Sequence, residues 1–219
     1  MKKSYAFAAS VSALLLAGAA MAHDDENKVS KTYDLAGFDE IDVGGVYELD
    51  VKVGPAFSVV LSGNERDMAR VEVSVKDGAL KLGQRDRARG DRNRNHDHGV
   101  NAVITLPSLV GLDVSGVVEG KVENIDTENF EVNISGVGDV ELFGECGALN
   151  ANVSGVGDLD AEELKCRRVD VRLSGVGDAS VYASDEVDAK VSGMGDIDVY
   201  GSPKKVDKSK GMFSDITIH

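Results

Sequence analysis

A five-residue motif recurs at an almost constant step along the second half of the chain. Ser-Gly-Val-Gly-Asp begins at Ser135, Ser154 and Ser174, a near copy begins at Ser192, and a degenerate copy begins at Ser115. Successive copies start 20, 19, 20 and 18 residues apart. A unit of this size cannot bury an apolar face alone, so it must stack on its neighbours. The spacing therefore predicts a solenoid.

Apolar and polar side chains alternate before each motif. The apolar positions are the first and the third before each Ser, and they hold Leu112, Val114, Val132, Ile134, Ala151, Val153, Val171, Leu173, Ala189 and Val191. Polar residues lie between them, as the two faces of a strand require. The unit has room for two or three short strands but not for a strand, a helix and a second strand. The pattern predicts an all-β fold, a parallel β-helix or stacked β-solenoid with about 20 residues per coil.

The N-terminal residues carry the features of an export signal. A basic start, an apolar run and the small residues Ala20 and Ala22 follow one another, so residues 1–22 are predicted to be a signal peptide. The run is too short and too rich in Ala to match a transmembrane helix. Residues 23–31 are polar and charged, and a flexible leader is expected there. The product is expected in the periplasm or outside a bacterial cell.

The remaining sequence divides into two parts of one expected domain. Residues 32–107 contain short alternating runs, which predict an N-terminal β-rich part, and residues 108–219 hold the repeats and a C-terminal cap. Residues 84–99 are charged throughout and have no apolar face. Such a run cannot cover a core, so it is expected to form a solvated loop between two strands.

The charge of the chain narrows the range of partners. The formal charge of −14 becomes −16 when the signal peptide and its two lysines are removed. Nucleic acid and anionic lipid are excluded as partners, because binding them depends on Lys and Arg that displace counterions. The sequence after residue 22 contains no second long apolar run, so no membrane-spanning segment is predicted there. The absence of Trp and an aromatic content of 5% argue against a typical sugar-binding groove.

The two cysteines occupy equivalent positions in consecutive repeats. Cys146 and Cys166 each lie eight residues before the Ser of the next motif. Neighbouring strands are about 4.8 Å apart, which lies within the Cα separation of about 4.4–6.8 Å that a disulfide tolerates. A disulfide between two coils is predicted for an exported protein. The alternative is a pair of free thiols packed as small apolar groups.

Three features in fixed order resemble one protein family. They are the segment 34–43, the segment 101–109 and the serial Ser-Gly-Val-Gly-Asp units. Together they are similar to the head GIN domain family, described as adhesin heads of autotransporters and formerly as a domain of unknown function. The resemblance spans about residues 32–218. It implies an exported bacterial β protein with stacked repeats, and it brings no catalytic motif.

An acidic row is the strongest candidate for a binding site. Asp139, Asp158, Asp178 and Asp196 follow the Gly-x-Gly corners, and Glu119 takes that place in the degenerate copy. Stacked about 4.8 Å apart, these charges would repel one another, and a cation such as Ca²⁺ would relieve the repulsion. An Asp after Gly-x-Gly is more commonly a turn former that bonds its own backbone. The turn interpretation is favoured, and the Ca²⁺ site remains the alternative.

Other candidate residues have simpler structural explanations. His96 and His98 lack a third positioned ligand, so a solvated loop is favoured over a metal site. The repeated Ser residues have no Gly-x-Ser-x-Gly surroundings and no His within the repeats, so hydroxyls that bond along the stack are favoured over nucleophiles. No catalytic or cofactor-binding residue is assigned.

The sequence contains a regular array of repeats and no set of catalytic residues. It therefore predicts an exported module that is not an enzyme and that serves as an adhesin-like binding domain or as a scaffold of the cell envelope. Its partner is expected to be an unidentified cell-envelope or surface ligand. One alternative is an enzyme that acts on an envelope polysaccharide, which would need paired acids in a cleft; the other is a Ca²⁺-binding repeat protein. The last coil, near Val199, would expose a strand edge, so end-to-end self-association is expected unless residues 202–219 cover it.

Overall fold

The computed structural model describes residues 28–85 and 99–219. The predicted signal peptide, residues 23–27 of the leader and residues 86–98 of the charged loop lie outside this part. Within it no helix is long and apolar enough to cross a membrane. The elements are β1 (Lys28–Tyr33), β2 (Glu40–Val43), β3 (Val46–Val53), β4 (Ser58–Asn64), α1 (Glu65–Met68), β5 (Val71–Lys76), β6 (Ala79–Gln84), β7 (Val100–Leu106), β8 (Gly111–Val114), β9 (Val117–Ile134), β10 (Val137–Val153), β11 (Leu159–Leu173), β12 (Ala179–Val191), β13 (Gly195–Tyr200), β14 (Lys205–Lys210) and β15 (Ser214–Ile218).

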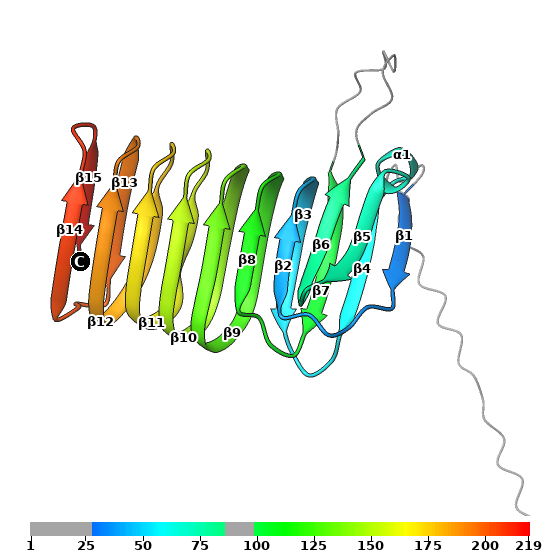
Figure 1. Cartoon of the computed structure of the whole chain (residues 1–219), viewed down its shortest axis with the longest axis horizontal. Coiled ribbons are helices and arrows are strands. Elements are labelled where there is room, and N and C mark those ends of the chain that lie inside the picture. Colours follow the sequence, from blue (N-terminus) through cyan, green and yellow to red (C-terminus); the bar gives the residue numbers. More distant parts are fainter. Residues whose placement is uncertain (1–27, 86–98) are drawn as a thin grey trace, which may run out of the picture.

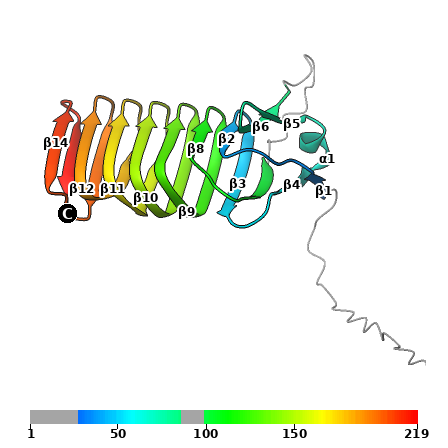
Figure 2. The same ribbon diagram turned by 60° about the horizontal axis from the view of Figure 1, so that its bottom comes forward.

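The strands wind into a flattened coil with two sides. On side I a strand such as β8 runs toward a glycine-rich corner, and the chain returns on side II in the first half of β9. A turn at the opposite edge leads back to side I, so β9 to β12 each contribute to both sides. Neighbouring coils pair in parallel along one axis (Figure 1, Figure 2). The predicted all-β solenoid with about 20 residues per coil is confirmed.

The inward side chains form the predicted apolar columns. Val114 pairs with Ile134, and the same column continues through Val153, Leu173 and Val191. None of these five residues is more than 3% exposed. Each coil covers the apolar residues of the next, so the core is a continuous column along the axis.

The glycine-rich corners bring successive coils into close contact. The carbonyl oxygen of Ile134 accepts hydrogen bonds from the N–H of Ser154 at 2.8 Å and from the N–H of Gly155 at 3.1 Å. A Cβ atom on Gly155 would lie 1.9 Å from the carbonyl oxygen of Gly136 in the preceding coil. Only glycine allows that approach, which explains its place after the Ser of each motif.

The solenoid begins earlier than the expected boundary at residue 108. β2 pairs in parallel with β8 and β3 pairs with β9, so residues 40–53 form a complete coil beside the first repeat. The carbonyl oxygen of Val43 accepts from the N–H groups of both Ser115 and Gly116. This coil keeps the glycine corner and the alternation of the later coils but lacks the five-residue motif, which is why the motif places the boundary too late.

The stacking order differs from the chain order at the N-terminal end. β6 pairs with β2 and β7 pairs with β3, so the coil of β2 and β3 lies between the coil of β6 and β7 and that of β8 and β9. β4 and β5 continue the stack as antiparallel strands, and β1 pairs with β4. Residues 28–31 therefore belong to a strand, which corrects the expected flexible leader. The free edge of β4 supplies the backbone partners that order them.

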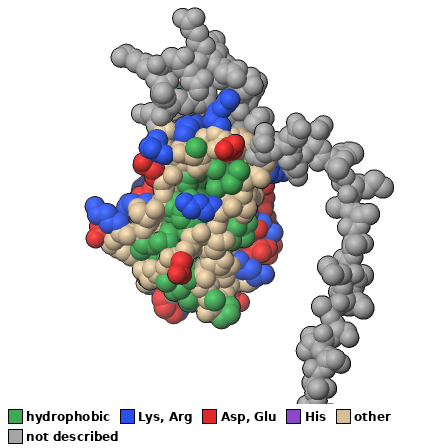
Figure 3. Space-filling model, turned by 90° about the vertical axis from the view of Figure 1, so that its right-hand side faces the viewer, with side chains coloured by type: hydrophobic (Ala, Val, Ile, Leu, Met, Phe, Trp, Pro, Cys, Tyr) green, Lys and Arg blue, Asp and Glu red, His purple; other side chains and the backbone are tan. Residues whose placement is uncertain are grey.

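The two ends of the stack have different surfaces. Figure 3 views the N-terminal end, where hydrophobic side chains gather around basic ones. There Val29 is 40% exposed, and Lys31 Nζ lies 4.6 Å from the centre of the Tyr33 ring. At the other end β14 and β15 form one more coil. Lys208 and Lys210 pair there with inward-facing Ala189 and Val191, and charges at such positions oppose the addition of another strand.

Candidate binding surfaces

Cys146 and Cys166 form the predicted disulfide. They are paired neighbours in β10 and β11, and their Cα atoms lie 4.5 Å apart. Both are buried at the edge of the coil opposite the glycine corners. The bond ties two adjacent coils together, so it is a structural link and not an exposed reactive site.

The predicted acidic row is longer than its motif. On side II, equivalent positions of successive coils hold Glu48, Glu119, Asp139, Asp158, Asp178, Asp196 and Asp215, which we call the acidic column. Glu48 and Asp215 were missed because no Gly-x-Gly precedes them. The usable signal is the apolar residue two positions earlier, Val46 and Phe213.

Four members of the column accept a hydrogen bond from the backbone of the next coil: Asp139, Asp158, Asp178 and Asp196. The Oδ1 atom of Asp139 accepts from the N–H of Asp158 at 3.2 Å, and that of Asp196 accepts from the N–H of Asp215 at 2.6 Å. Gly157, which precedes Asp158, has a φ of +144°. The N–H of Asp158 then donates to the carboxylate of Asp139 in the preceding coil. The carboxylate therefore satisfies a backbone donor where the corner departs from regular strand geometry.

This contact refines the turn interpretation of the Asp residues. The backbone partner belongs to the neighbouring coil and not to the same turn. In residues 28–85 and 99–219, no group of three or more His, Cys, Asp and Glu side chains is arranged to hold a metal ion. A cation along the acidic column stays a prediction, and His96 and His98 lie outside the described residues.

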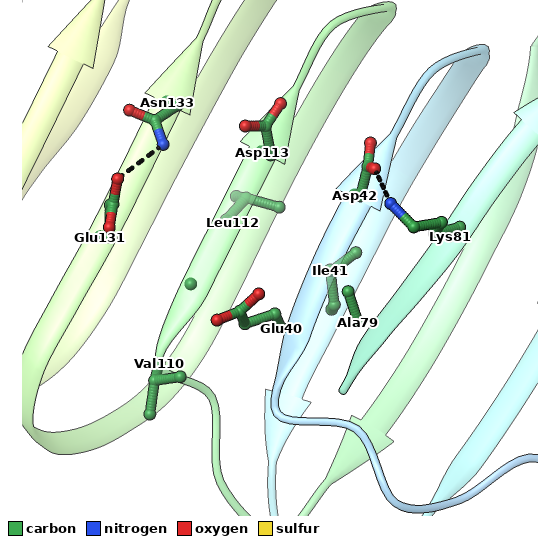
Figure 4. Close-up of a pocket in the computed structure, with 11 residues that line it drawn as sticks. Glu40, Ile41, Asp42, Ala79, Lys81, Val110, Leu112, Asp113, Glu131 and Asn133 are labelled. Carbon is green, nitrogen blue, oxygen red and sulfur yellow. Dashed lines mark hydrogen bonds and ion pairs between the residues drawn. The ribbon is translucent and has the colours of Figure 1, made fainter. Parts of the chain in front are cut away.

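A shallow groove of about 250 Å³ lies on side I where β2, β6, β8 and β9 meet (Figure 4). Gly111 faces it between Glu40 and Glu131 of the adjacent coils. A Cβ atom on Gly111 would lie 3.3 Å from Cγ of Glu40. The missing side chain thus leaves the space into which Glu40 extends. Asp42 and Asp113 line the same groove.

The groove concentrates negative charge. Burial, followed by the nearby carboxylates of Asp42 and Glu131, raises the pKa of Asp113 above its ordinary value. Lys81 Nζ lies 2.6 Å from Oδ2 of Asp42, and this hydrogen bond raises the pKa of Lys81. Nδ2 of Asn133 donates a hydrogen bond of 3.0 Å to Oε1 of Glu131. One lysine against several carboxylates makes the groove suited to cationic groups and to hydrogen-bond donors.

A second hollow of about 660 Å³ continues along side I toward the C-terminal end. It shares Glu40, Val110 and Glu131 with the first. Further members are Asn150, Arg168, Asp170, Glu186 and Asp188, which come from successive coils. The two hollows form one long groove, which we call the side I groove. Its polar residues were not identified as a site from the sequence, because they vary from coil to coil.

A group of rings lies on side II near the C-terminal end. The rings of Tyr200 and His219 stack with centroids 4.6 Å apart, and Asp198 Oδ1 lies 2.8 Å from Nε2 of His219. Lys165 Nζ lies 4.3 Å from the centre of the Tyr182 ring, and Tyr182 pairs with Tyr200. The low aromatic content gave no sign of this cluster, since the residues come together only through coil register.

Comparison with known proteins points to one family. The sequence model described as "Putative auto-transporter adhesin, head GIN domain" matches residues 37–203. A putative adhesin from Bacteroides fragilis NCTC 9343 has a similar structure, with a TM-score of 0.71, 24% identity, and coverage of 89% of this chain and 98% of that chain. Putative adhesins from Parabacteroides merdae ATCC 43184 and Parabacteroides distasonis ATCC 8503 give TM-scores of 0.53 and 0.52 at 14% and 17% identity. Both comparisons cover 88% of this chain, and they cover 97% and 98% of those chains. At these identities the likeness shows the fold, and no curated protein matches the chain.

Proposed function

Because this chain belongs to the head GIN domain family of putative auto-transporter adhesins, we propose that it is an exported, adhesin-like module that binds a ligand of the cell envelope or surface without chemical turnover. The basic start, apolar run and small residues of segment 1–22 support export to the periplasm or the cell exterior. The uninterrupted stack of coils supports binding along a face of the solenoid.

The observation that carries this proposal is the side I groove. It runs across successive coils and is lined by charged and amide side chains from β2 to β12. Its N-terminal part holds Glu40, Asp42, Asp113 and Glu131 around the gap at Gly111. A ligand that presents ammonium groups or several hydroxyl donors complements this lining.

The test is the binding of labelled protein to bacterial cells and to arrays of glycans and basic peptides. Replacing Asp113→Asn and Glu131→Gln together keeps the shape of the groove and removes two charges. Asp160→Asn on side II is the matched control, since Asn retains the oxygen that accepts from the N–H of Glu162. We expect the groove variant to lose at least tenfold in affinity and the control to bind as the parent protein does.

Two results would contradict the proposal. One is equal binding by the parent protein and the groove variant, which would place the ligand elsewhere. The other is release of new reducing ends or peptides from isolated envelope material, which would show turnover. Thermal melts of both variants establish first that they are folded.

A further inference from the structure

A line of exposed apolar side chains runs along side II beside the glycine corners. Its central members are Val117, Val137, Val156, Val176 and Met194, which are 42–57% exposed and pair one with the next. Val46 pairs with Val117 at one end. At the other end Phe213 is 77% exposed and precedes Ser214, the partner of Gly195. We call this line the apolar ridge.

Folding alone does not require apolar residues at these positions. Strands favour β-branched residues, but Thr meets that preference as well as Val does. The next outward position of each coil belongs to the acidic column, so polar side chains are readily accommodated on this side. Single exposed apolar residues are common on protein surfaces, whereas a continuous exposed apolar line indicates an interaction surface.

We propose that the apolar ridge and the acidic column together form a docking surface for a basic amphipathic helix that lies parallel to the axis of the stack. The ridge offers an apolar side chain at every coil, about every 4.8 Å. Along a helix, an apolar stripe advances about 5.3 Å between contacts, because contacts recur every 3.5 residues and each residue rises 1.5 Å. The two repeats therefore differ by about 0.5 Å per contact, which adds up to about 3 Å over the whole ridge, whereas the repeat of an extended strand differs by about 2 Å at every contact.

The negative charge of the acidic column favours a positively charged partner. The acidic column lies two residues along each strand from the ridge and follows it from Glu48 to Asp215. Lys and Arg beside the apolar stripe of a helix would meet these carboxylates, whereas an acidic helix would be repelled. The ridge from Val46 to Phe213 spans six coil steps, about 29 Å, which is the length of a helix of about 20 residues.

Spacing argues against an extended strand as the occupant, and charge argues against an antiparallel second copy. An extended strand places side chains of one face about 6.8 Å apart, out of step with the ridge. A second copy of this chain in antiparallel arrangement would bring its own acidic column against the first. The proposed surface lies on side II, away from the side I groove, so it goes beyond the function proposed above and can be tested separately.

The experiment measures the affinity of the full chain for three synthetic peptides of about 20 residues. The first places Leu at alternating steps of three and four residues with Lys between them. The second replaces Lys by Glu, and the third alternates Leu and Lys to form a strand face. We expect the first peptide to bind at least tenfold more tightly than either control. Its helical circular dichroism signal should increase on binding, and its affinity should fall as the salt concentration rises.

Two sets of variants locate the contact. Val137→Thr, Val156→Thr and Val176→Thr combined keep β-branching and remove apolar surface, and we expect at least a tenfold loss. Asp158→Asn and Asp178→Asn combined keep the oxygen that accepts the backbone hydrogen bond and remove charge, so we expect at least a fivefold loss and a weaker dependence on salt. Glu72→Gln on β5, outside both the apolar ridge and the side I groove, is the control and should leave the affinity for the peptide unchanged.

Three outcomes would overturn the proposal. Affinity that does not distinguish the three peptides excludes a basic helix as the partner. Affinity that the Val→Thr set leaves intact places the contact elsewhere. A dimer in sedimentation equilibrium that the same set dissociates identifies a second copy as the occupant. Thermal melts establish that each variant is folded before any loss is interpreted.

Discussion

The carboxylate of Asp158 accepts a hydrogen bond of 2.7 Å from the backbone N–H of Asp178, its counterpart one coil further along the stack. Asp178 in turn accepts from the N–H of Asp196 at 2.8 Å. Like charges thus stand next to one another because each offers an oxygen to the backbone of its neighbour. The acceptor role and the charge of these residues can be separated by substitution.

Asp178→Ala should lower the free energy of unfolding by about 1 kcal/mol, because the N–H of Asp196 loses its acceptor. Asp178→Asn retains that oxygen and should lose much less. Urea unfolding followed by circular dichroism measures both. A rise in Tm with millimolar Ca²⁺ in the parent protein, removed by Asp178→Asn, would support a bound cation instead.

Loss of the disulfide should destabilise the stack considerably. Cys146 and Cys166 close a loop with a sequence separation of 20, for which chain entropy gives about 3 kcal/mol. The variant with Cys146→Ala and Cys166→Ala should unfold at lower urea, and the parent protein should behave likewise under reductant. A midpoint unchanged by either treatment would show that coil packing alone sets stability.

Gly155→Ala should be among the most damaging single changes at a corner. The new Cβ atom would lie 1.9 Å from the carbonyl oxygen of Gly136, so the coils must separate, at a cost of about 2–3 kcal/mol. Gly83→Ala is the matched control, since the nearest atom would be 3.8 Å away. Thermal melts of the two variants should differ clearly, and equal melting temperatures would refute the close packing of corners.

The stability of the fold should depend on pH through Asp113. Its folded-state pKa is raised by burial and by Asp42 and Glu131. The favourable contribution is present below the ordinary carboxyl pKa, near 4, and is lost as the pH rises through the raised value. Asp113→Asn should therefore be more stable than the parent protein at pH 7 and no more stable at pH 3. An NMR titration of the Asp113 carboxyl that gives an ordinary pKa would contradict this.

Lys208 should protect the C-terminal end from stacking. It pairs with inward-facing Ala189 and donates to the carbonyl oxygen of Ile216 at 3.4 Å. Lys208→Val together with Lys210→Val would restore an apolar inward face to the last coil and should produce concentration-dependent association. Sedimentation velocity of both proteins measures this. A variant that remains monomeric at all concentrations would show that the lysines are not the barrier.

Much of the fold could be predicted because the repeated motif shows which residues of successive coils occupy equivalent positions. The equal offsets of Cys146 and Cys166 from the next Ser were sufficient to pair them, and alternation before each Ser identified the buried columns. These inferences rest on local order that every coil repeats. The short alternating runs within residues 32–107 also predicted strands there, and β3 and β7 are two of them.

The partners of those N-terminal strands could not be predicted. β3 lies between β7 and β9, and nothing local in residues 46–53 distinguishes this from a hairpin with β4. The side I groove had no sequence signal for a related reason. Its outward residues differ from coil to coil, so Glu40, Gly111 and Glu131 become neighbours only through pairing between distant strands.

The central position of β2 and β3 also governs the order in which the polypeptide acquires structure. When residues 40–53 leave the ribosome, both parallel neighbours of their strands are still to be synthesised, because β6 and β7 begin at Ala79 and Val100, and β8 and β9 begin at Gly111 and Val117. Neither edge of this coil can be completed by what has already been made. The coil of β2 and β3 can therefore be covered on both of its edges only after β8 and β9 have been made, which delays its long-range parallel pairing.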